Sequence, residues 1–204
     1  MNMKKVLLGI VAAVLAAAPA FAQDAEKPKR KMPSSAKYFT SLKAAMKEAA
    51  RYDAPIFVSV VGKGTFWESE SKKVMKHKFF QELASKGFFV YTMSVELSKK
   101  EKSFDGRTPK PLFEKLSAED QALLDVIWPP SSLRKLPRWS MVTPDAKALK
   151  INQVDMPGMP KYGYLGPYLQ SLQSAAQAYG IDIEMSKALV KYIEFPPEKK
   201  KKKQ

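Results

Sequence analysis

The chain has 204 residues, of which 35 are lysine or arginine, 20 are aspartate or glutamate, and none is cysteine. Its formal charge of +15 would favour anionic partners, but a solvated basic surface that serves only solubility is the preferred explanation. Without cysteine the chain forms no disulfide, offers no thiolate nucleophile and binds no metal through sulfur.

The first 22 residues have the pattern of an export signal. Lys4 and Lys5 precede an apolar run, and Ala20-Phe21-Ala22 fits the small-x-small rule for cleavage. A retained membrane anchor would need about 20 apolar residues, and this run is shorter. We therefore predict a signal peptide at residues 1–22 and a soluble protein in the periplasm or outside the cell.

A polar, basic segment follows and leads into one predicted domain. Residues 23–37 contain Pro28 and Pro33 and no apolar periodicity, which indicates a flexible basic linker. The domain is expected at residues 38–194, because the chain is too short for two domains of ordinary size. Residues 195–204, FPPEKKKKKQ, are predicted to be a disordered lysine-rich tail.

The domain begins with a predicted helix and a buried strand. Ser41 is a good N-cap, and the helix behind it ends near Asp53, with apolar residues at i, i+3, i+4 and i+7: Leu42, Ala45, Met46 and Ala49. Residues 55–61, PIFVSVV, are short and rich in β-branched side chains, as expected of a central strand covered on both faces.

A second helix and a second strand follow. The segment TFWESESKKVM opens a helical pattern that continues through Met75, Phe79 and Leu83 to Gly87, so we predict one helix over residues 68–86. Residues 88–97, FFVYTMSVEL, predict another buried strand. A helix between two apolar strands is typical of a parallel pair, so the fold class is α/β.

The remainder predicts an insertion, a hairpin and closing helices. Residues 98–136 form the insertion, with short helices and a good helix start at Ser117. RWSMVT and ALKINQV, on either side of Pro144-Asp145, predict an antiparallel hairpin. A helix with Pro167 near its start runs to Gly180, and residues 181–193 predict one more short element.

Four segments, in this order, resemble exported thioredoxin-like proteins. SLKAAMKEAARYDAPIFVSVVG is similar to the family's helix and first core strand, and WESESKKVMKHKFF to its Trp-Cys-x-x-Cys-Lys segment, with Trp67 and Lys72 matching. LPRWSMVTPDAKAL resembles the segment around the family's cis-proline, with Pro137 as that proline, and YGYLGPYLQSLQSA its closing helix. The likeness covers about residues 38–180 without the insertion.

The resemblance implies a three-layer α/β/α sandwich with a mixed central sheet and a helical insertion before the cis-proline. It also places Glu68 where the family has its nucleophilic cysteine and Ser71 where it has the resolving cysteine. Neither side chain supports disulfide exchange, because a serine hydroxyl does not reach the thiolate-like state near neutral pH. Glu68 and Glu70 are predicted instead to be first-turn acids that complement the helix dipole.

No other catalytic site is indicated. His77, the only histidine, lies between Lys76 and Lys78, which favours a surface position over a catalytic one. The sequence has no zinc spacing, no complete calcium loop at Asp105-Gly106 and no phosphate-loop pattern. We therefore predict no catalytic residue, no metal and no cofactor, and rank a non-redox enzyme third among the functions.

Two binding functions remain open. By resemblance, an extended protein or peptide would bind in a groove around the former cysteine positions. The residues that would line this groove are Phe66, Trp67, Pro137, Arg138 and Trp139. Packing in the core or the hairpin would explain most of these residues equally well. The alternative is a basic envelope protein that binds an anionic polymer or a membrane surface through its lysine run: Lys199, Lys200, Lys201, Lys202 and Lys203. The identity of the partner and the oligomeric state are not indicated.

Overall fold

A computed structural model describes residues 32–102, 107–128, 134–147, 149, 156–157 and 165–194. The predicted signal peptide, linker residues 23–31 and the lysine-rich tail lie outside this part of the chain. In the described ranges, no helix combines the length and the apolar character that a membrane crossing requires.

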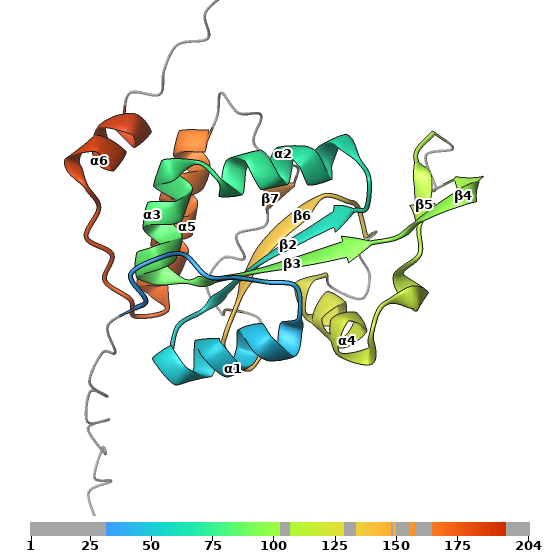
Figure 1. Cartoon of the computed structure of the whole chain (residues 1–204), viewed down its shortest axis with the longest axis horizontal. Coiled ribbons are helices and arrows are strands. Elements are labelled where there is room, and N and C mark those ends of the chain that lie inside the picture. Colours follow the sequence, from blue (N-terminus) through green and yellow to red (C-terminus); the bar gives the residue numbers. More distant parts are fainter. Residues whose placement is uncertain are drawn as a thin grey trace, which may run out of the picture.

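A five-stranded mixed sheet forms the centre of the molecule (Figure 1), in the order β1-β3-β2-β6-β7. The strands β1, β3 and β2 run parallel to one another, β6 is antiparallel to β2, and β7 is antiparallel to β6. Their bounds are Tyr38–Phe39 for β1, Ile56–Gly62 for β2, Phe89–Val95 for β3, Arg138–Val142 for β6 and Met156–Pro157 for β7.

Helices cover both faces of this sheet. On one face lie α1 (Leu42–Tyr52) and α4 (Ala118–Ile127), and on the other lie α2 (Phe66–Met75), α3 (Lys78–Gly87) and α5 (Leu165–Ala178) (Figure 1). The last helix, α6 (Lys187–Glu194), contacts α5. Every residue of β2 is buried, because its alternate side chains enter two separate apolar clusters, one under each helical layer. The predicted three-layer α/β/α sandwich is confirmed.

The predicted helix cap, helix end and cis-proline are all present. The Ser41 side chain accepts a hydrogen bond from the Ala44 N–H at 3.4 Å and so caps α1. The helix ends at Asp53, which has a left-handed backbone conformation with φ of 50°. The peptide bond between Leu136 and Pro137 is cis, as the resemblance implied, and it immediately precedes β6.

The prediction of one helix over residues 68–86 is wrong. α2 ends at Met75, and His77 has an extended backbone and caps a new helix, α3, by accepting the Phe79 N–H on Nδ1 at 3.4 Å. The apolar periodicity does not reveal the break, because α2 and α3 bury their side chains in the same cluster. His77 is half-buried beside Phe79 and Tyr192, and burial, with a smaller effect of Lys78, lowers its pKa.

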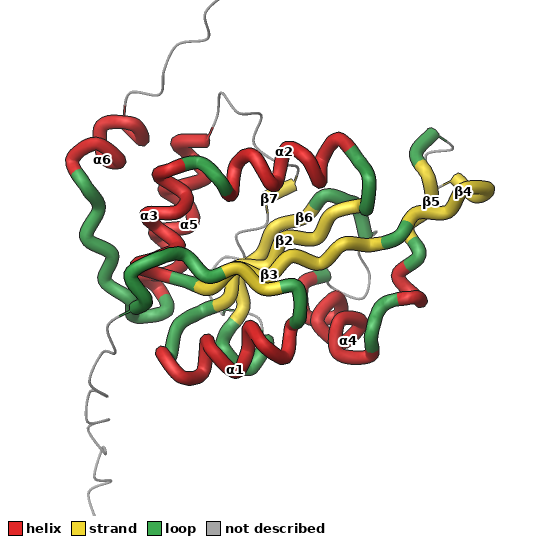
Figure 2. Tube along the Cα trace, in the orientation of Figure 1, coloured by secondary structure: helices red, strands yellow, loops and turns green. Residues whose placement is uncertain are grey.

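The insertion contains a feature that was not predicted. β4 (Leu97–Lys102) and β5 (Pro109–Pro111) form a separate two-stranded antiparallel sheet, which extends beyond β3 at one end of the molecule (Figure 2). A 3-10 helix, Phe113–Lys115, follows it, and Ser117 caps α4 as expected. The lysine-rich strand β4 lacks the apolar alternation from which a strand is predicted.

The closing hairpin is only partly described. β6 corresponds to the predicted strand RWSMVT, and it lies between two antiparallel neighbours, β2 on one side and β7 at Met156–Pro157 on the other. Of the predicted strand ALKINQV, only Leu149 is described. The last two predicted elements are present as α5 and α6, separated by Gly180 with φ of 97°.

Candidate functional site

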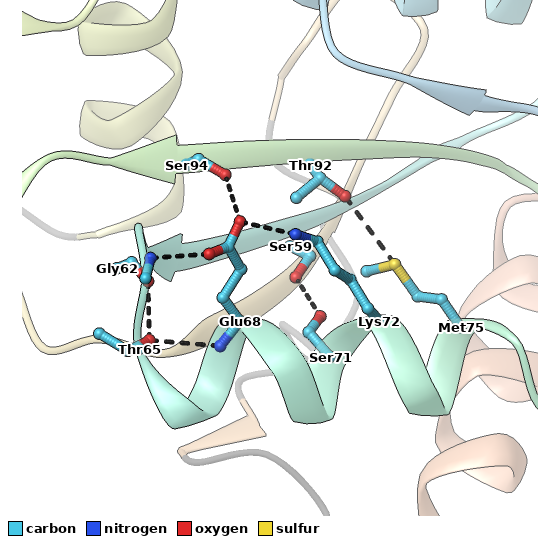
Figure 3. Close-up of polar contacts among 10 residues, drawn as sticks. Ser59, Gly62, Thr65, Glu68, Ser71, Lys72, Met75, Thr92 and Ser94 are labelled. Atoms are coloured by element: carbon cyan, nitrogen blue, oxygen red, sulfur yellow. Dashed lines mark hydrogen bonds and ion pairs between the residues drawn. The ribbon is translucent and has the colours of Figure 1, made fainter.

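The candidate site lies at the N-terminus of α2, just after the carboxyl end of β2. Thr65 is the N-cap: its Oγ1 accepts the Glu68 N–H at 3.2 Å and donates to the Gly62 carbonyl at 2.7 Å (Figure 3). Gly64 supplies the positive φ of 74° that the turn before the cap requires. The helix therefore starts two residues earlier than predicted, and Glu70 lies beyond its first turn.

The carboxylate of Glu68 joins three segments of the chain. Its Oε2 accepts the Gly64 N–H at 2.7 Å, and its Oε1 accepts Lys72 Nζ at 3.0 Å and Ser94 Oγ at 3.5 Å (Figure 3). The Gly64 N–H is the main reason that the pKa of Glu68 lies below its ordinary value, followed by the hydrogen bond from Lys72. Glu68 thus remains ionised near neutral pH and connects the loop, α2 and β3.

Replacement of Glu68 by glutamine is expected to destabilise the protein in a pH-dependent way. Because the folded-state pKa is below the ordinary value of 4.5, the ionised carboxylate stabilises the fold above that pH. This contribution is lost as the pH falls through the folded-state pKa. We expect Glu68→Gln to lower the free energy of unfolding by about 1 kcal/mol at most at pH 7, since water screens part of the interaction.

Urea unfolding at several pH values measures this difference. Glu70→Gln is the matched control, because in the part of the chain that the structure describes Glu70 pairs with Lys73 alone, at 2.6 Å. A Glu68→Gln effect that stayed constant from neutral pH to below the folded-state pKa would contradict the assigned role.

Ser71 lies beneath α2 in the core. Its side chain is 1% exposed, and its Oγ lies 2.9 Å from the Oγ of Ser59, which belongs to β2 and is fully buried (Figure 3). Either hydroxyl can be the donor. Because Ser71 has almost no contact with solvent, it has no route to attack a substrate as a nucleophile. Its role here is to connect α2 to the centre of the sheet.

The five predicted groove residues differ in their access to a partner. Phe66 is 67% exposed, Trp67 is half-buried, and their rings meet edge to face with centroids 5.3 Å apart. Pro137 and Trp139 are buried. Arg138 is half-buried and held against α4, where its Nη2 donates to the Ile127 carbonyl at 3.0 Å and its guanidinium lies 4.8 Å from the Trp128 ring centroid.

Trp67 contacts the exposed Phe66 on one side and the buried core on the other. It packs against the apolar cluster that contains Trp139. Phe66 and Trp67 are therefore the solvent-accessible aromatic members of the predicted groove, while Trp139 lies within the buried cluster. The predicted contact of a partner with Trp139 itself would require the core to open.

Sequence reasoning missed three residues that build the site: Ser59, Thr65 and Ser94. The spacing Thr65-x-x-Glu68 is that of a capping box, and it could have placed the helix start correctly. The contacts of Ser59 and Ser94 depend on the register of β2 and β3, which one sequence does not give. Within the described ranges, no three potential metal-ligating side chains gather in one place.

Comparison with known proteins finds similarity in solved structures. No protein-family model and no curated protein sequence matches the chain. A structure described as DsbH oxidoreductase aligns with a TM-score of 0.45 and 11% identity, over 76% of this chain and 94% of the other. A thioredoxin-fold protein from Helicobacter pylori aligns with a TM-score of 0.38 and 12% identity, over 80% of this chain and 88% of the other.

These alignments are remote, and the assignment of the fold rests on the molecule itself. Three strands of the sheet, β1, β3 and β2, are parallel; β6 is antiparallel to β2, and β7 is antiparallel to β6. Helices cover both faces of the sheet, and a cis-proline precedes β6. This arrangement is the one that the sequence resemblance implied. The chain therefore has a thioredoxin-like α/β fold, and it contains no cysteine.

Proposed function

We propose that the protein is exported and acts as a non-catalytic binding module, which holds a protein or peptide partner at the surface of Phe66 and Trp67. The absence of cysteine removes disulfide exchange, and the two residues that the resemblance assigns to the cysteine positions are engaged in structural contacts. Binding without chemistry is the function that this arrangement supports best.

The observation that carries the proposal is the exposed aromatic pair at the start of α2. Ligands of open α/β sheets commonly bind beyond the carboxyl ends of the strands, and α2 begins at that end of β2. Aromatic side chains that a rigid scaffold supports are frequent anchors for a polypeptide partner. Trp67 is supported by the core, and Phe66 stands against it with most of its surface in water.

We expect Phe66→Ala to weaken peptide binding by at least about 10-fold, which is the effect of losing a strong interface anchor. Peptides would be selected from a displayed library with the chain from Gln23 onward, and their affinities measured by calorimetry. Trp67→Ala should weaken the same peptides, and the wild-type protein should show no insulin reduction.

Tyr38→Ala is the matched control, because Tyr38 and Phe66 are the two exposed large hydrophobic residues in the described ranges. Its effect on affinity should be small, and circular dichroism would verify that each variant is folded. The proposal fails if peptide affinity is unchanged in both Phe66→Ala and Trp67→Ala. It also fails if affinity depends on salt but not on these two side chains, which would indicate binding by charge alone.

A further inference from the structure

A row of lysines follows Phe66 along the outer side of α2. At about 100° per residue, Phe66, Lys72, Lys73 and Lys76 fall within one third of the helix circumference. All four are exposed, and the opposite side of the helix carries its buried residues, Ser71, Val74 and Met75. α2 lies on the opposite side of the sheet from α1 (Figure 1). Because its buried residues pack toward the sheet, the row of lysines faces the solvent.

The row continues into α3 and borders a shallow hollow. Lys78, the first residue of α3, is exposed, and its ammonium group lies 4.8 Å from the centroid of the Phe79 ring. The hollow has a volume of about 550 Å³ and is lined by Glu70, Lys73, Lys76 and His77. We call Phe66, Lys72, Lys73, Lys76 and Lys78 the lysine–aromatic face.

This face has an excess of positive charge. The two acidic residues of α2 each pair with one lysine, Glu68 with Lys72 at 3.0 Å and Glu70 with Lys73 at 2.6 Å. In the part of the chain that the structure describes, Lys76 and Lys78 have no acidic partner within salt-bridge distance. Two lysines thus remain available to an anionic partner.

The helix that precedes the lysine run in the sequence lies beside the start of α3. α6 contacts the start of α3, where the ring centroid of Tyr192 lies 5.4 Å from that of His77 and 4.8 Å from that of Phe79. Glu194 ends α6, and the sequence continues to Lys199 and the four lysines after it. The last described helix before the lysine run therefore adjoins the lysine–aromatic face.

Lysines beside an exposed phenylalanine match the chemistry of a lipid surface better than that of a charged polymer. Cations attract anionic head groups, while an aromatic side chain enters the boundary between head groups and acyl chains. An anionic polysaccharide offers no apolar layer, so it would pair with the lysines and leave Phe66 in water. We propose that the lysine–aromatic face docks the protein on an anionic phospholipid surface, with Phe66 entering the interface.

Vesicle sedimentation tests this proposal with the chain from Gln23 onward. Vesicles of phosphatidylglycerol and phosphatidylcholine should bind the protein, and vesicles of phosphatidylcholine alone should not. The double variant Lys76→Gln, Lys78→Gln should bind the anionic vesicles at least about 10-fold more weakly, since each lysine near such a surface contributes about fivefold. Phe66→Ala should weaken binding by a similar factor.

The matched control is Lys43→Gln with Lys47→Gln. It removes the same charge from exposed positions of α1, on the other side of the sheet. At physiological salt its effect should stay below about twofold, because screening confines these interactions to about 8 Å. A separate measurement reports which face of the protein meets the membrane. Brominated lipid should quench the fluorescence of Trp67. It should not quench the Trp67→Phe variant, because the two remaining tryptophans, Trp128 and Trp139, are 1% exposed.

The outcomes separate this inference from the proposed function. Deletion of residues 195–204 should weaken vesicle binding and leave a remainder that still depends on Lys76 and Lys78. The inference is overturned if that deletion removes all binding, if the α1 and α2 lysine variants behave alike, or if the protein binds heparin or nucleic acid but not vesicles. Peptide affinity should not change in the Lys76→Gln, Lys78→Gln variant, so failure of one proposal leaves the other intact.

Discussion

Trp139→Ala is expected to lower the free energy of unfolding by about 3–5 kcal/mol, a large fraction of the stability of an ordinary domain. The Trp139 ring is 1% exposed and meets Phe57 edge to face, with centroids 5.0 Å apart and an interplanar angle of 83°. It also contacts Phe80 and Tyr168, so it joins β6 to β2, α3 and α5. Removing the ring leaves a cavity that this cluster closes only partly.

Denaturant unfolding followed by circular dichroism measures this loss. Trp139→Phe should cost clearly less, because it keeps an aromatic ring and removes the buried Nε1, which has no hydrogen-bond partner among the described residues. The Phe66→Ala variant is the exposed counterpart, and its stability should change by about 0.5 kcal/mol or less. If Trp139→Ala lost peptide affinity at full stability, Trp139 would be a contact residue after all.

Ser71→Ala is expected to destabilise the protein by about 1–3 kcal/mol. The substitution removes the hydrogen bond between Ser71 and Ser59 and leaves the Ser59 hydroxyl buried without that partner. Ser59→Ala should have a similar cost for the same reason. The double variant should cost less than the sum of the two single variants, because replacing both hydroxyls leaves no unpaired polar group from this pair.

A double-mutant cycle from denaturant unfolding gives the coupling between the two serines. Ser69→Ala is the matched control on α2, since Ser69 is exposed and its effect should stay within about 0.5 kcal/mol. Additive costs for Ser59 and Ser71 would mean that the two hydroxyls do not depend on each other, and would contradict the contact described here.

Much of the fold could be predicted because its signals are local. The apolar run of β2 indicates a strand with both faces covered, and Ser41 and Ser117 indicate helix starts. The break at His77 could not be predicted in the same way. Periodicity reports which side of a helix is buried, and that side is shared by α2 and α3. β1 was missed because two residues carry too little pattern to indicate a strand.

The sequence identified most residues of the site, but it did not show which of them are exposed and which are buried. The sequence identified Glu68, Ser71 and the aromatic residues near them, because they lie next to one another or match a known segment. It could not tell that Phe66 is exposed and Trp139 buried, since one precedes a predicted helix and the other lies in a predicted strand. Their opposite exposure depends on packing between distant segments, as the contacts of Trp139 with Phe57 and Tyr168 show.

The three contacts of Glu68 fix the start of α2, and with it the positions of Phe66 and Trp67. The carboxylate ties the turn before α2, the helix itself and the neighbouring strand into one unit, and none of these contacts responds to reductant or oxidant. The position of Phe66 and Trp67 is therefore independent of redox poise. A chain without cysteine has no thiol–disulfide switch at this surface, so the start of α2 keeps the same preorganised geometry in reducing and oxidising surroundings.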